Sequence, residues 1–304
     1  MSNTPEQPVL EAVANAAGSV PRAWHRVTGG GYTPAERWVV ELDDGSRAFA
    51  KVATVEYIRD WLRSEHRAYR DIAGPFMPRL LGWADEPVPA LLLEDLSTGH
   101  WPPPWRPGMV EQVLDALDEV AATSCPSWAR PIQEEAAELF AGWSSVASNP
   151  QPFLGLGLVT PGWLESALPT LIEHEFPREV EGSALVHFDV RSDNLCIRPD
   201  RALLVDWNWI VRGNPLFDVA AWLPSLAHEG GPMPEAVKPE AGVFAAALAG
   251  YFCSRAPEPI IPDAPHVRRV QREQAATALP WAARRLGLPP PDGPAFASGK
   301  PPAN

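Results

Sequence analysis

Three polar residues interrupt a series of very short apolar segments in the second half of the chain. The segments lie at 184–187, 195–198 and 202–206, and their length predicts short strands rather than helices. Asp189 and Asn194 stand on the loop between the first two segments, and Asp206 ends the third. Ligands can reach side chains on such loops. The oxygens of Asn194 and Asp206 suit Mg²⁺, and the carboxylate of Asp189 can align a hydroxyl group and accept its proton.

The composition limits the class of protein and its partners. The chain has 304 residues, 45% hydrophobic and 21% charged, which is ordinary for a globular protein and enough for two cores. The net charge of −13 argues against a nucleic-acid partner, because phosphate backbones bind surfaces rich in Lys and Arg. The same charge is compatible with a cationic small molecule, although many proteins are acidic for solubility alone.

Targeting signals and membrane segments are not evident. No apolar run reaches the roughly 18 residues of a membrane helix, so we expect no membrane partner. The first residues have neither the basic region nor the apolar core of a signal peptide. The cysteines are widely spaced and fit neither a disulfide framework nor a metal site. We therefore expect a cytoplasmic protein. We also expect a monomer or a weak homodimer.

The first 96 residues predict a small antiparallel sheet with one main helix. Residues 35–53 predict a β-hairpin, because Asp44 and Gly45 separate two strand-like runs and Gly accepts a positive φ at low cost. The other elements expected here are a helix at 54–73 and strands at 78–83 and 90–95.

Beyond residue 96 the pattern is mostly helical. Pro107 precedes a run with helical spacing of apolar residues from Met109 to Ala122, and Pro is favourable at a helix start. Further helices are predicted near 131–148, 161–176, 215–227, 235–254 and 263–286. We expect a lobe of residues 1–96, a lobe of residues 97–288 and a proline-rich tail, 289–304, that is too poor in apolar residues to become ordered.

Lys51 is the candidate cation of the first lobe. It lies in the middle of a predicted strand among apolar residues, where a Lys usually has a carboxylate partner or binds a phosphate. Alternatively, it protects an edge strand from pairing with another chain. Glu65, on the following helix, is the candidate partner, with Glu56 and Glu94 as competitors.

Together these residues resemble the aminoglycoside phosphotransferase and choline kinase-like family of small-molecule kinases. The resemblance covers roughly residues 25–255. It rests on Gly29–Gly31, Lys51, Glu65, the strand that ends at Leu96, the motifs at 187–194 and 205–207, and AsnProLeuPheAspValAla at 214–220. It implies an α+β, bilobal, protein-kinase-like fold whose C-terminal lobe is mostly helical with short strands. It also implies Mg²⁺ and ATP or GTP in a cleft between the lobes.

The resemblance implies a role for each motif. Asp189 resembles the family's base, Asn194 and Asp206 resemble its metal ligands, and Lys51, aimed by Glu65, resembles its phosphate-binding lysine. Cofactor contacts are also expected from Gly29, Gly30 and Gly31 on the phosphates and from Glu94, Asp95 and Leu96 at the nucleobase.

Asp218 resembles the residue that braces the family's catalytic loop. Other positions depart from the family pattern. Phe188 stands where relatives often have Gly. Arg191 and Asp193 add charges beside the base. These two residues either pair with each other or influence the choice of acceptor.

The implied activity is transfer of the γ-phosphate of ATP or GTP to a hydroxyl of a small molecule, such as an aminoglycoside-like antibiotic, an amino-alcohol or a sugar. A protein kinase is a weaker alternative, because the eleven residues between Asp206 and Asp218 leave no room for an activation loop. A nucleotide-binding pseudokinase is another, although the polar residues are all present. The candidates for acceptor contacts are Asp193, Trp209, Trp222, His228 and Glu229, of which Trp222 is more typical of a core.

Overall fold

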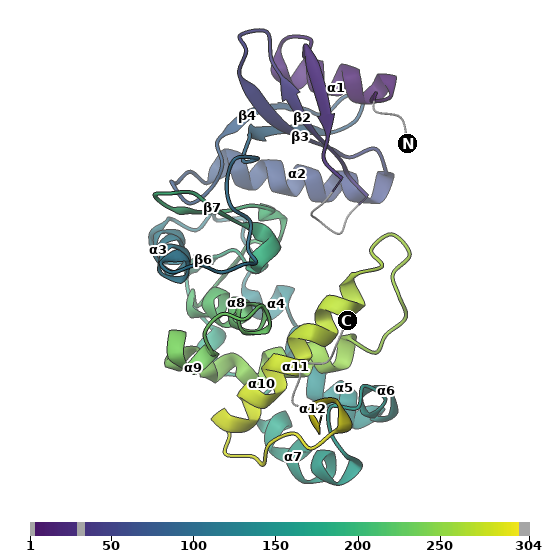
Figure 1. Cartoon of the computed structure of the whole chain (residues 1–304), viewed down its shortest axis with the longest axis vertical. Helices are drawn as coiled ribbons and strands as arrows, with labels where there is room; N and C mark the ends of the chain where they lie inside the picture. The colour runs from purple at the N-terminus through teal and green to yellow at the C-terminus, as the bar shows by residue number, and fades with distance from the viewer. Residues whose placement is uncertain (1–3, 29–33, 298–304) are drawn as a thin grey trace. The chain divides into compact units, whose positions relative to one another are not determined.

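The computed structural model describes residues 4–28 and 34–297. The chain forms two compact units, each built from segments that are far apart in the sequence. Unit 1 consists of Met1–Pro102, Gly108–Pro126 and Asp193–Ile210, and unit 2 of Pro103–Pro107, Ser127–Ser192 and Val211–Asn304. A sheet with flanking helices forms most of unit 1 and helices form most of unit 2 (Figure 1), which confirms the predicted α+β class.

Unit 1 contains a five-stranded antiparallel sheet with the strand order β1-β2-β3-β5-β4. The strands are β1 (Ala23–Arg26), β2 (Glu36–Glu41), β3 (Arg47–Val52), β4 (Leu80–Ala84) and β5 (Ala90–Glu94). β2 and β3 form the predicted hairpin, and Gly45 has a φ of +80° in its turn. Successive side chains of a strand point to opposite faces, so the sheet presents two different surfaces.

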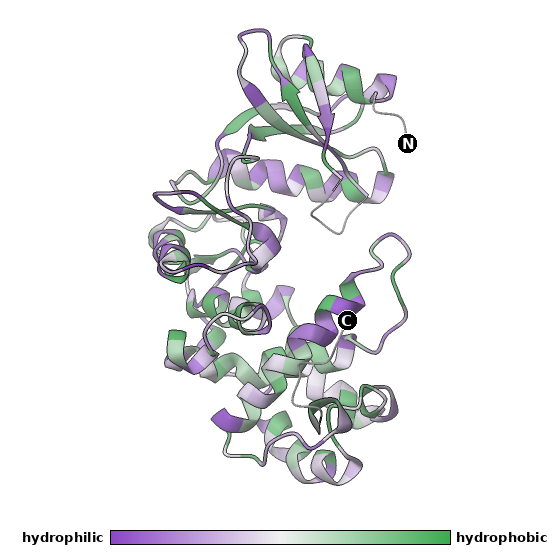
Figure 2. Ribbon diagram, in the orientation of Figure 1, coloured by the Kyte–Doolittle hydropathy of each residue, from purple (hydrophilic) through white to green (hydrophobic). Residues whose placement is uncertain are grey.

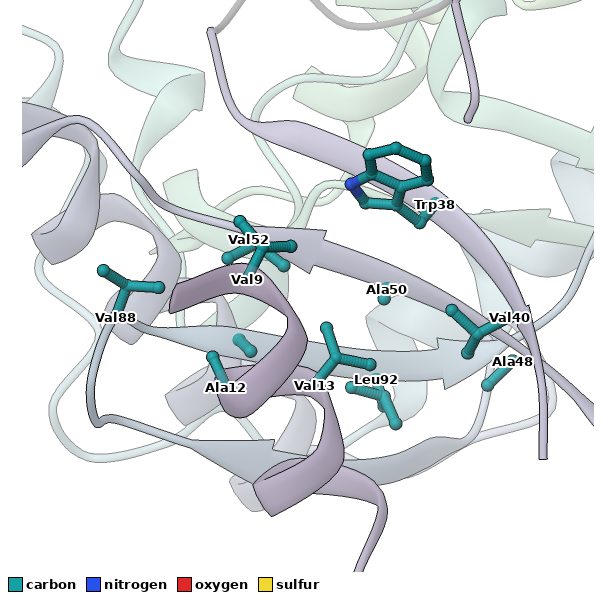
Figure 3. Packing of buried hydrophobic residues seen from close by; sticks show 11 residues of the cluster. Val9, Ala12, Val13, Trp38, Val40, Ala48, Ala50, Val52, Val88 and Leu92 are labelled. Atoms are coloured by element: carbon teal, nitrogen blue, oxygen red, sulfur yellow. The ribbon is translucent and has the colours of Figure 1, made fainter. Parts of the chain in front are cut away.

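One face of the sheet packs against α1 (Gln7–Ala17), a helix that the sequence analysis did not predict. Proline stands in the first turn of α1 and Gly18 ends it at a φ of +70°. Only three residues of α1 are fully buried, which left a weak periodic signal in the sequence. This core, part of which Figure 3 shows, comprises Val9, Ala12, Val13, Trp38, Val40, Ala48, Ala50, Val52, Val88, Ala90 and Leu92.

α2 (Glu56–Asp71), predicted at 54–73, lies on the other side of the sheet from α1 (Figure 1). Its buried residues are Ile58, Leu62, Glu65, Ala68 and Tyr69. Figure 2 shows much of the rest of the helix as hydrophilic. This amphipathic pattern buries a single carboxylate, that of Glu65, within an otherwise apolar stripe.

The remaining elements of unit 1 come from two later segments. α3 (Met109–Ala122) has the bounds that its apolar spacing predicted. It packs against the antiparallel pair β7 (Leu195–Ile197) and β8 (Ala202–Leu204). η4 (Trp207–Trp209) follows and packs against α2.

Unit 2 is built around α5, α8, α10 and α11, with a short antiparallel pair, β6–β9, at one side. The strands are β6 (Ala184–Val186) and β9 (Val211–Gly213). The helices are α4 (Ile132–Glu135), η1 (Leu139–Ala141), α5 (Gly142–Ser148), α6 (Gln151–Leu154), α7 (Pro161–Glu173), η2 (Arg178–Val180), η3 (Ser192–Asn194, at the boundary with unit 1), α8 (Leu216–His228), α9 (Pro234–Val237), η5 (Pro239–Phe244), α10 (Ala245–Arg255), α11 (Val267–Arg285) and α12 (Pro294–Ala297).

The expected disorder of the tail from residue 289 is wrong as far as Ala297. The carboxylate of Asp292 accepts hydrogen bonds from N and Oγ1 of Thr160 at 2.8 and 2.7 Å. Nε1 of Trp163 donates to the carbonyl of Pro289 at 2.9 Å. Hydrogen bonds, rather than apolar burial, hold this segment on unit 2. Among the described residues, no helix combines the length and the apolar character needed to cross a membrane.

Candidate active site

Lys51 lies on β3, and its Nζ forms two ion pairs. It lies 2.7 Å from Oε2 of Glu65 and 2.6 Å from Oδ1 of Asp206. The side chains of Lys51 and Glu65 are 13% and 3% exposed, so each charge depends on its partners rather than on water. Burial opposes the charged amine, but the carboxylates of Asp206 and Glu65 outweigh it and raise the pKa of Lys51. Lys51 therefore remains a cation, and the predicted pairing with Glu65 is confirmed.

A pocket of about 440 Å³ opens beside this network, and all of its lining residues belong to unit 1. Its polar lining includes Lys51, Glu65 and Asp206 together with Asn194 and Asp193. Its apolar lining comprises Val27, Val39, Phe49, Pro78, Leu93, Leu96, Trp101, Pro102 and Val205. An apolar cavity with charged groups gathered in one part is suited to a ligand with a flat apolar portion and an anionic portion.

The alternation of the strands determines which side chains reach this pocket. On β3, Phe49 and Lys51 line the pocket, whereas Ala48, Ala50 and Val52 face the α1 core. On β5, Leu93 lines the pocket and Leu92 faces the core. A shift of one residue in the register would exchange the two faces, so the hairpin turn fixes Lys51 in the pocket.

The side chain of Glu94 is held by two arginines. Its Oε1 lies 2.8 Å from Nη1 of Arg198, and its Oε2 lies 3.5 Å from Nε of Arg79. Burial alone would raise the pKa of Glu94, but these arginines outweigh it and lower the pKa. Glu94 therefore fixes the end of β5, and its carboxylate is engaged within the protein.

Asp95 has a similar bracing role. Its Oδ1 accepts from the Ser97 N–H and its Oδ2 from the Ser97 hydroxyl, both at 2.9 Å. Oδ2 also pairs with Nε of Arg47 at 3.2 Å. Both Asp95 and Leu96 line the pocket, and their contact with a nucleobase stays a prediction.

Asn194 and Asp206 both line the pocket because the β7–β8 hairpin reverses the chain between them. The carbonyl of Asn194 accepts from the N–H of Val205 at 3.0 Å, which closes the hairpin. Trp207 is fully buried and its Nε1 donates to the carbonyl of Leu204 at 2.8 Å, which anchors the chain next to Asp206. One carboxylate and one amide suit Mg²⁺, which keeps water and phosphate oxygens as its other ligands. Among the described residues, no three His, Cys, Asp or Glu side chains form a metal cluster.

Asp189 belongs to unit 2, on the loop that follows β6. Its N–H donates to Nδ1 of the fully buried His187 at 3.3 Å, which gives His187 a structural role in this loop. The N–H groups of His187 and Phe188 donate to the carboxylate of Asp218 at 2.7 and 2.8 Å. Asp218 is in the first turn of α8 and braces the loop, as the family resemblance implied.

Asp218 is buried, and its ionisation reflects that position. Burial raises its pKa to about 7, while the hydrogen bonds from Phe188 and His187 act in the opposite direction. The negative charge of Asp189 contributes further to the increase in pKa.

Arg191 pairs with the predicted base. Its Nε lies 3.1 Å from Oδ1 of Asp189, and its side chain is 18% exposed. The sequence left open a pairing of Arg191 with Asp193 or an influence on the choice of acceptor. The observed ion pair places the positive charge of Arg191 beside the Asp189 carboxylate.

The candidates for acceptor contacts fall in different parts of the fold. Trp222 is fully buried, as expected of a core residue, and its ring lies 5.4 Å from that of Trp105. The carboxylate of Glu229 accepts from Nε1 of Trp105 at 2.7 Å and from the hydroxyl of Ser192. Trp209, in unit 1, is 40% exposed.

Two parts of the site differ from the predicted set: the glycine loop and Arg37. Gly29, Gly30 and Gly31, the predicted phosphate loop, lie outside the described residues. Arg37, on β2, lines the pocket but was not predicted as a site residue. The hairpin register pairs Arg37 with Lys51. The predicted turn at Asp44–Gly45 determines this register, so the pairing could have been predicted from the sequence.

Comparisons with known proteins show the fold and the family of the chain. The fold is similar to that of a candidate fructosamine-3-kinase from Thermobifida fusca, with 18% identity, a TM-score of 0.56, and 89% of this chain and 98% of that chain covered. It is also similar to that of a choline/ethanolamine kinase family protein from Mesorhizobium loti, with 15% identity, a TM-score of 0.53, and coverage of 87% and 91%. At such identities the likeness shows the fold, which is kinase-like.

A comparison with curated protein sequences gave no match. A sequence model described as the phosphotransferase enzyme family matches residues 11–259, which is most of the chain. The protein therefore belongs to the phosphotransferase enzyme family.

Proposed function

We propose that the protein transfers the γ-phosphate of ATP or GTP to a hydroxyl group of a small molecule. The observation that carries this proposal is the Lys51–Glu65–Asp206 network, which faces a largely apolar pocket together with Asn194. A cation for the phosphates and two oxygen ligands for a metal are what phosphoryl transfer requires of a protein.

Each group has a defined part in the proposed reaction. The acceptor hydroxyl oxygen forms a bond to the γ-phosphorus while the bond from that phosphorus to the β–γ bridging oxygen breaks. Asp189 orients the hydroxyl group and takes its proton, and Lys51 stabilises the charge on the phosphates. The products are a phosphate monoester and a nucleoside diphosphate.

Asn194 and Asp206 are the proposed ligands of magnesium. When bound, Mg²⁺ would neutralise phosphate charge at this part of the pocket. Asp206 now pairs with Lys51 at 2.6 Å, so its carboxylate already points toward the place where the phosphates would be held. The apolar lining and the end of β5, at Glu94, Asp95 and Leu96, would receive the nucleobase.

The proposed acceptor is an amino-alcohol, a sugar or an aminoglycoside-like compound. The eleven residues from Trp207 to Phe217 contain η4, β9 and the start of α8, which leaves no segment for docking a peptide. The similar structures from T. fusca and M. loti carry the names of kinases of fructosamine and of choline or ethanolamine, which are small molecules. The net charge of −13 favours a cationic acceptor over an anionic one.

The test compares the wild type with Asp189→Asn and Asp206→Ala. Labelled ATP or GTP, Mg²⁺ and a panel of amino-alcohols, amino sugars, aminoglycosides and macrolides would identify the acceptor. Asp189→Asn should reduce transfer by at least about 100-fold and leave nucleotide affinity nearly unchanged, because Asp189 acts on the acceptor. Asp206→Ala should weaken Mg²⁺-dependent nucleotide binding as well.

Three results would contradict the proposal. Wild-type turnover by Asp189→Asn would remove Asp189 from the role of base. Label that appears on proteins would indicate a protein kinase. Tight nucleotide binding without transfer to any compound in the panel would favour a pseudokinase.

A further inference from the structure

Arg37 lies in the pocket directly opposite Lys51. The β2–β3 register pairs the two residues, and both side chains line the pocket from the same face of the sheet. Side chains that face each other across antiparallel strands have Cβ atoms roughly 5 Å apart, and like charges at such positions repel. Two cations in this arrangement therefore need nearby negative charge.

The carboxylates around Arg37 supply part of that charge. Burial lowers the pKa of the Arg37 guanidinium, and the charges of Asp206 and Glu65 oppose this effect. Both carboxylates also pair with Lys51. The same two carboxylates therefore partly neutralise both Lys51 and Arg37. Asp206 is in addition the proposed metal ligand.

Of the other acids that line the pocket (Glu94, Asp95 and Asp193), the first two pair with arginines outside it. Glu94 pairs with Arg198 and Arg79, and Asp95 with Arg47, and none of these arginines lines the pocket. The part of the pocket beside the sheet therefore contains the paired cations Arg37 and Lys51. If Asp206 bound a metal ion, as proposed above, Lys51 and Arg37 would share less of its negative charge.

We propose that Arg37 is a second phosphate-binding cation, which holds the polyphosphate of the nucleotide together with Lys51. This inference rests on the proposed function, because it assumes that the pocket binds a nucleotide. A guanidinium presents several N–H donors in one plane and binds two phosphate oxygens at once, whereas Lys51 acts as a point charge. Nη1 of Arg37 also donates to the carbonyl of Ala35 at 3.1 Å, which limits the orientations of the guanidinium.

The test measures the affinity of each protein for adenosine, AMP, ADP and ATP by calorimetry, or for the guanosine series if GTP is the donor. The variants are Arg37→Gln, which removes the charge, and Arg37→Lys, which keeps the charge but not the planar group. Arg22→Gln is the matched control, because Arg22 is exposed, pairs with Asp43 and does not line the pocket.

We expect Arg37→Gln to weaken ATP binding by about 10- to 100-fold, as for the loss of a hydrogen bond between charged groups. Adenosine affinity should change by less than about threefold, because the nucleoside has no phosphate. Arg37→Lys should lie between the wild type and Arg37→Gln, and Arg22→Gln should match the wild type throughout.

Two outcomes would overturn the assignment of Arg37 as a phosphate-binding residue but leave the proposed function intact. Equal losses for adenosine and ATP would show that Arg37 supports the shape of the pocket, and unchanged ATP affinity would show that it does not touch phosphate. If Arg37→Gln fails to fold, Arg37→Lys gives the same contrast between nucleoside and nucleotide. A wild-type protein that binds none of these compounds would overturn the proposed function, and Arg37 with it.

Discussion

Two residues of the candidate site have an unusual backbone conformation. Phe188 has a φ of +72° and Asp206 a φ of +69°, in the left-handed region that non-glycine residues seldom adopt. Such conformations gather at functional sites, where the surroundings enforce them. The Phe188 ring stacks on Phe217, with the ring centres 5.5 Å apart, and this contact offsets part of the strain. The position before Asp189 thus has a conformation that suits Gly, the residue that the family resemblance led us to expect there.

Tyr69 allows a test of polar burial beside the site. It lies one helical turn after Glu65 on α2 and is 5% exposed, and its hydroxyl finds no hydrogen-bond partner among the residues that the structure describes. Burial, with the nearby charges of Glu65 and Asp206, raises its pKa well above the ordinary value. An unsatisfied buried hydroxyl costs about 1–3 kcal/mol. Tyr69→Phe should therefore increase the free energy of unfolding by about 1 kcal/mol in urea denaturation.

The exposed Tyr57 provides the control for Tyr69. Its side chain is 47% exposed, so Tyr57→Phe should change the free energy of unfolding by less than about 0.5 kcal/mol. A loss of stability in Tyr69→Phe would show that the hydroxyl has a favourable partner and that the expectation is wrong.

The sequence predicted those site residues that carry a charge among apolar neighbours. Lys51 stood out because a charge lies within an apolar strand, and Glu65 because a carboxylate follows on the next helix. Arg37 was missed because its importance depends on strand register rather than on local composition. The hairpin turn fixes that register, so the pairing of Arg37 with Lys51 could have been deduced.

At the scale of elements, the predicted helices at 131–148 and 235–254 are each broken. The first consists of α4, η1 and α5, and the second of α9, η5 and α10. Pro239 begins η5, and a Pro removes a backbone donor and disfavours continuation of the preceding helix. Apolar spacing indicated helical character in both regions but could not locate these interruptions.

Close contact between α5 and α10 depends on glycine. A Cβ at Gly142 would overlap the backbone of Gly250. Gly142→Ala would force the two helices apart, and we expect a loss of about 3 kcal/mol in the free energy of unfolding, as for an overpacked core. Chemical denaturation followed by tryptophan fluorescence would measure it, because Trp143 lies in this interface and donates to the carbonyl of Ala246 at 2.8 Å.

Gly162, on α7, is the matched control. A Cβ there would meet no atom within 4 Å. Gly162→Ala should therefore stabilise the protein by about 0.5–1 kcal/mol, because Ala loses less backbone entropy than Gly in a helix. If both variants were equally stable, the close approach of α5 and α10 would not depend on Gly142.

For the whole molecule, the sequence predicted two bodies divided near residue 96, whereas contacts group the chain differently. Residues 108–126 and 193–210 pack in unit 1, although they follow that position in the sequence. Local patterns identify a helix at 109–122 and strands near 195 and 202, but which body they join depends on contacts between distant segments. The consequence is functional, since this grouping brings Asn194 and Asp206 to the pocket of Lys51.

This grouping predicts where a bound nucleotide should stabilise the protein. Every lining residue of the pocket belongs to unit 1, so Mg²⁺ with ADP should slow amide hydrogen exchange in β3, β5, β7 and β8. At a ligand concentration of about 100 times Kd, binding stabilises the native state by roughly 2.7 kcal/mol. Exchange through openings that release the ligand should slow by up to about 100-fold, whereas the exchange rates in α10 and α11 should change less.

Asp206→Ala should reduce the protection by Mg²⁺ with ADP while retaining the protection by ADP alone. Protection confined to α10 and α11 would mean that the nucleotide binds in unit 2 and that the pocket beside Lys51 has another ligand.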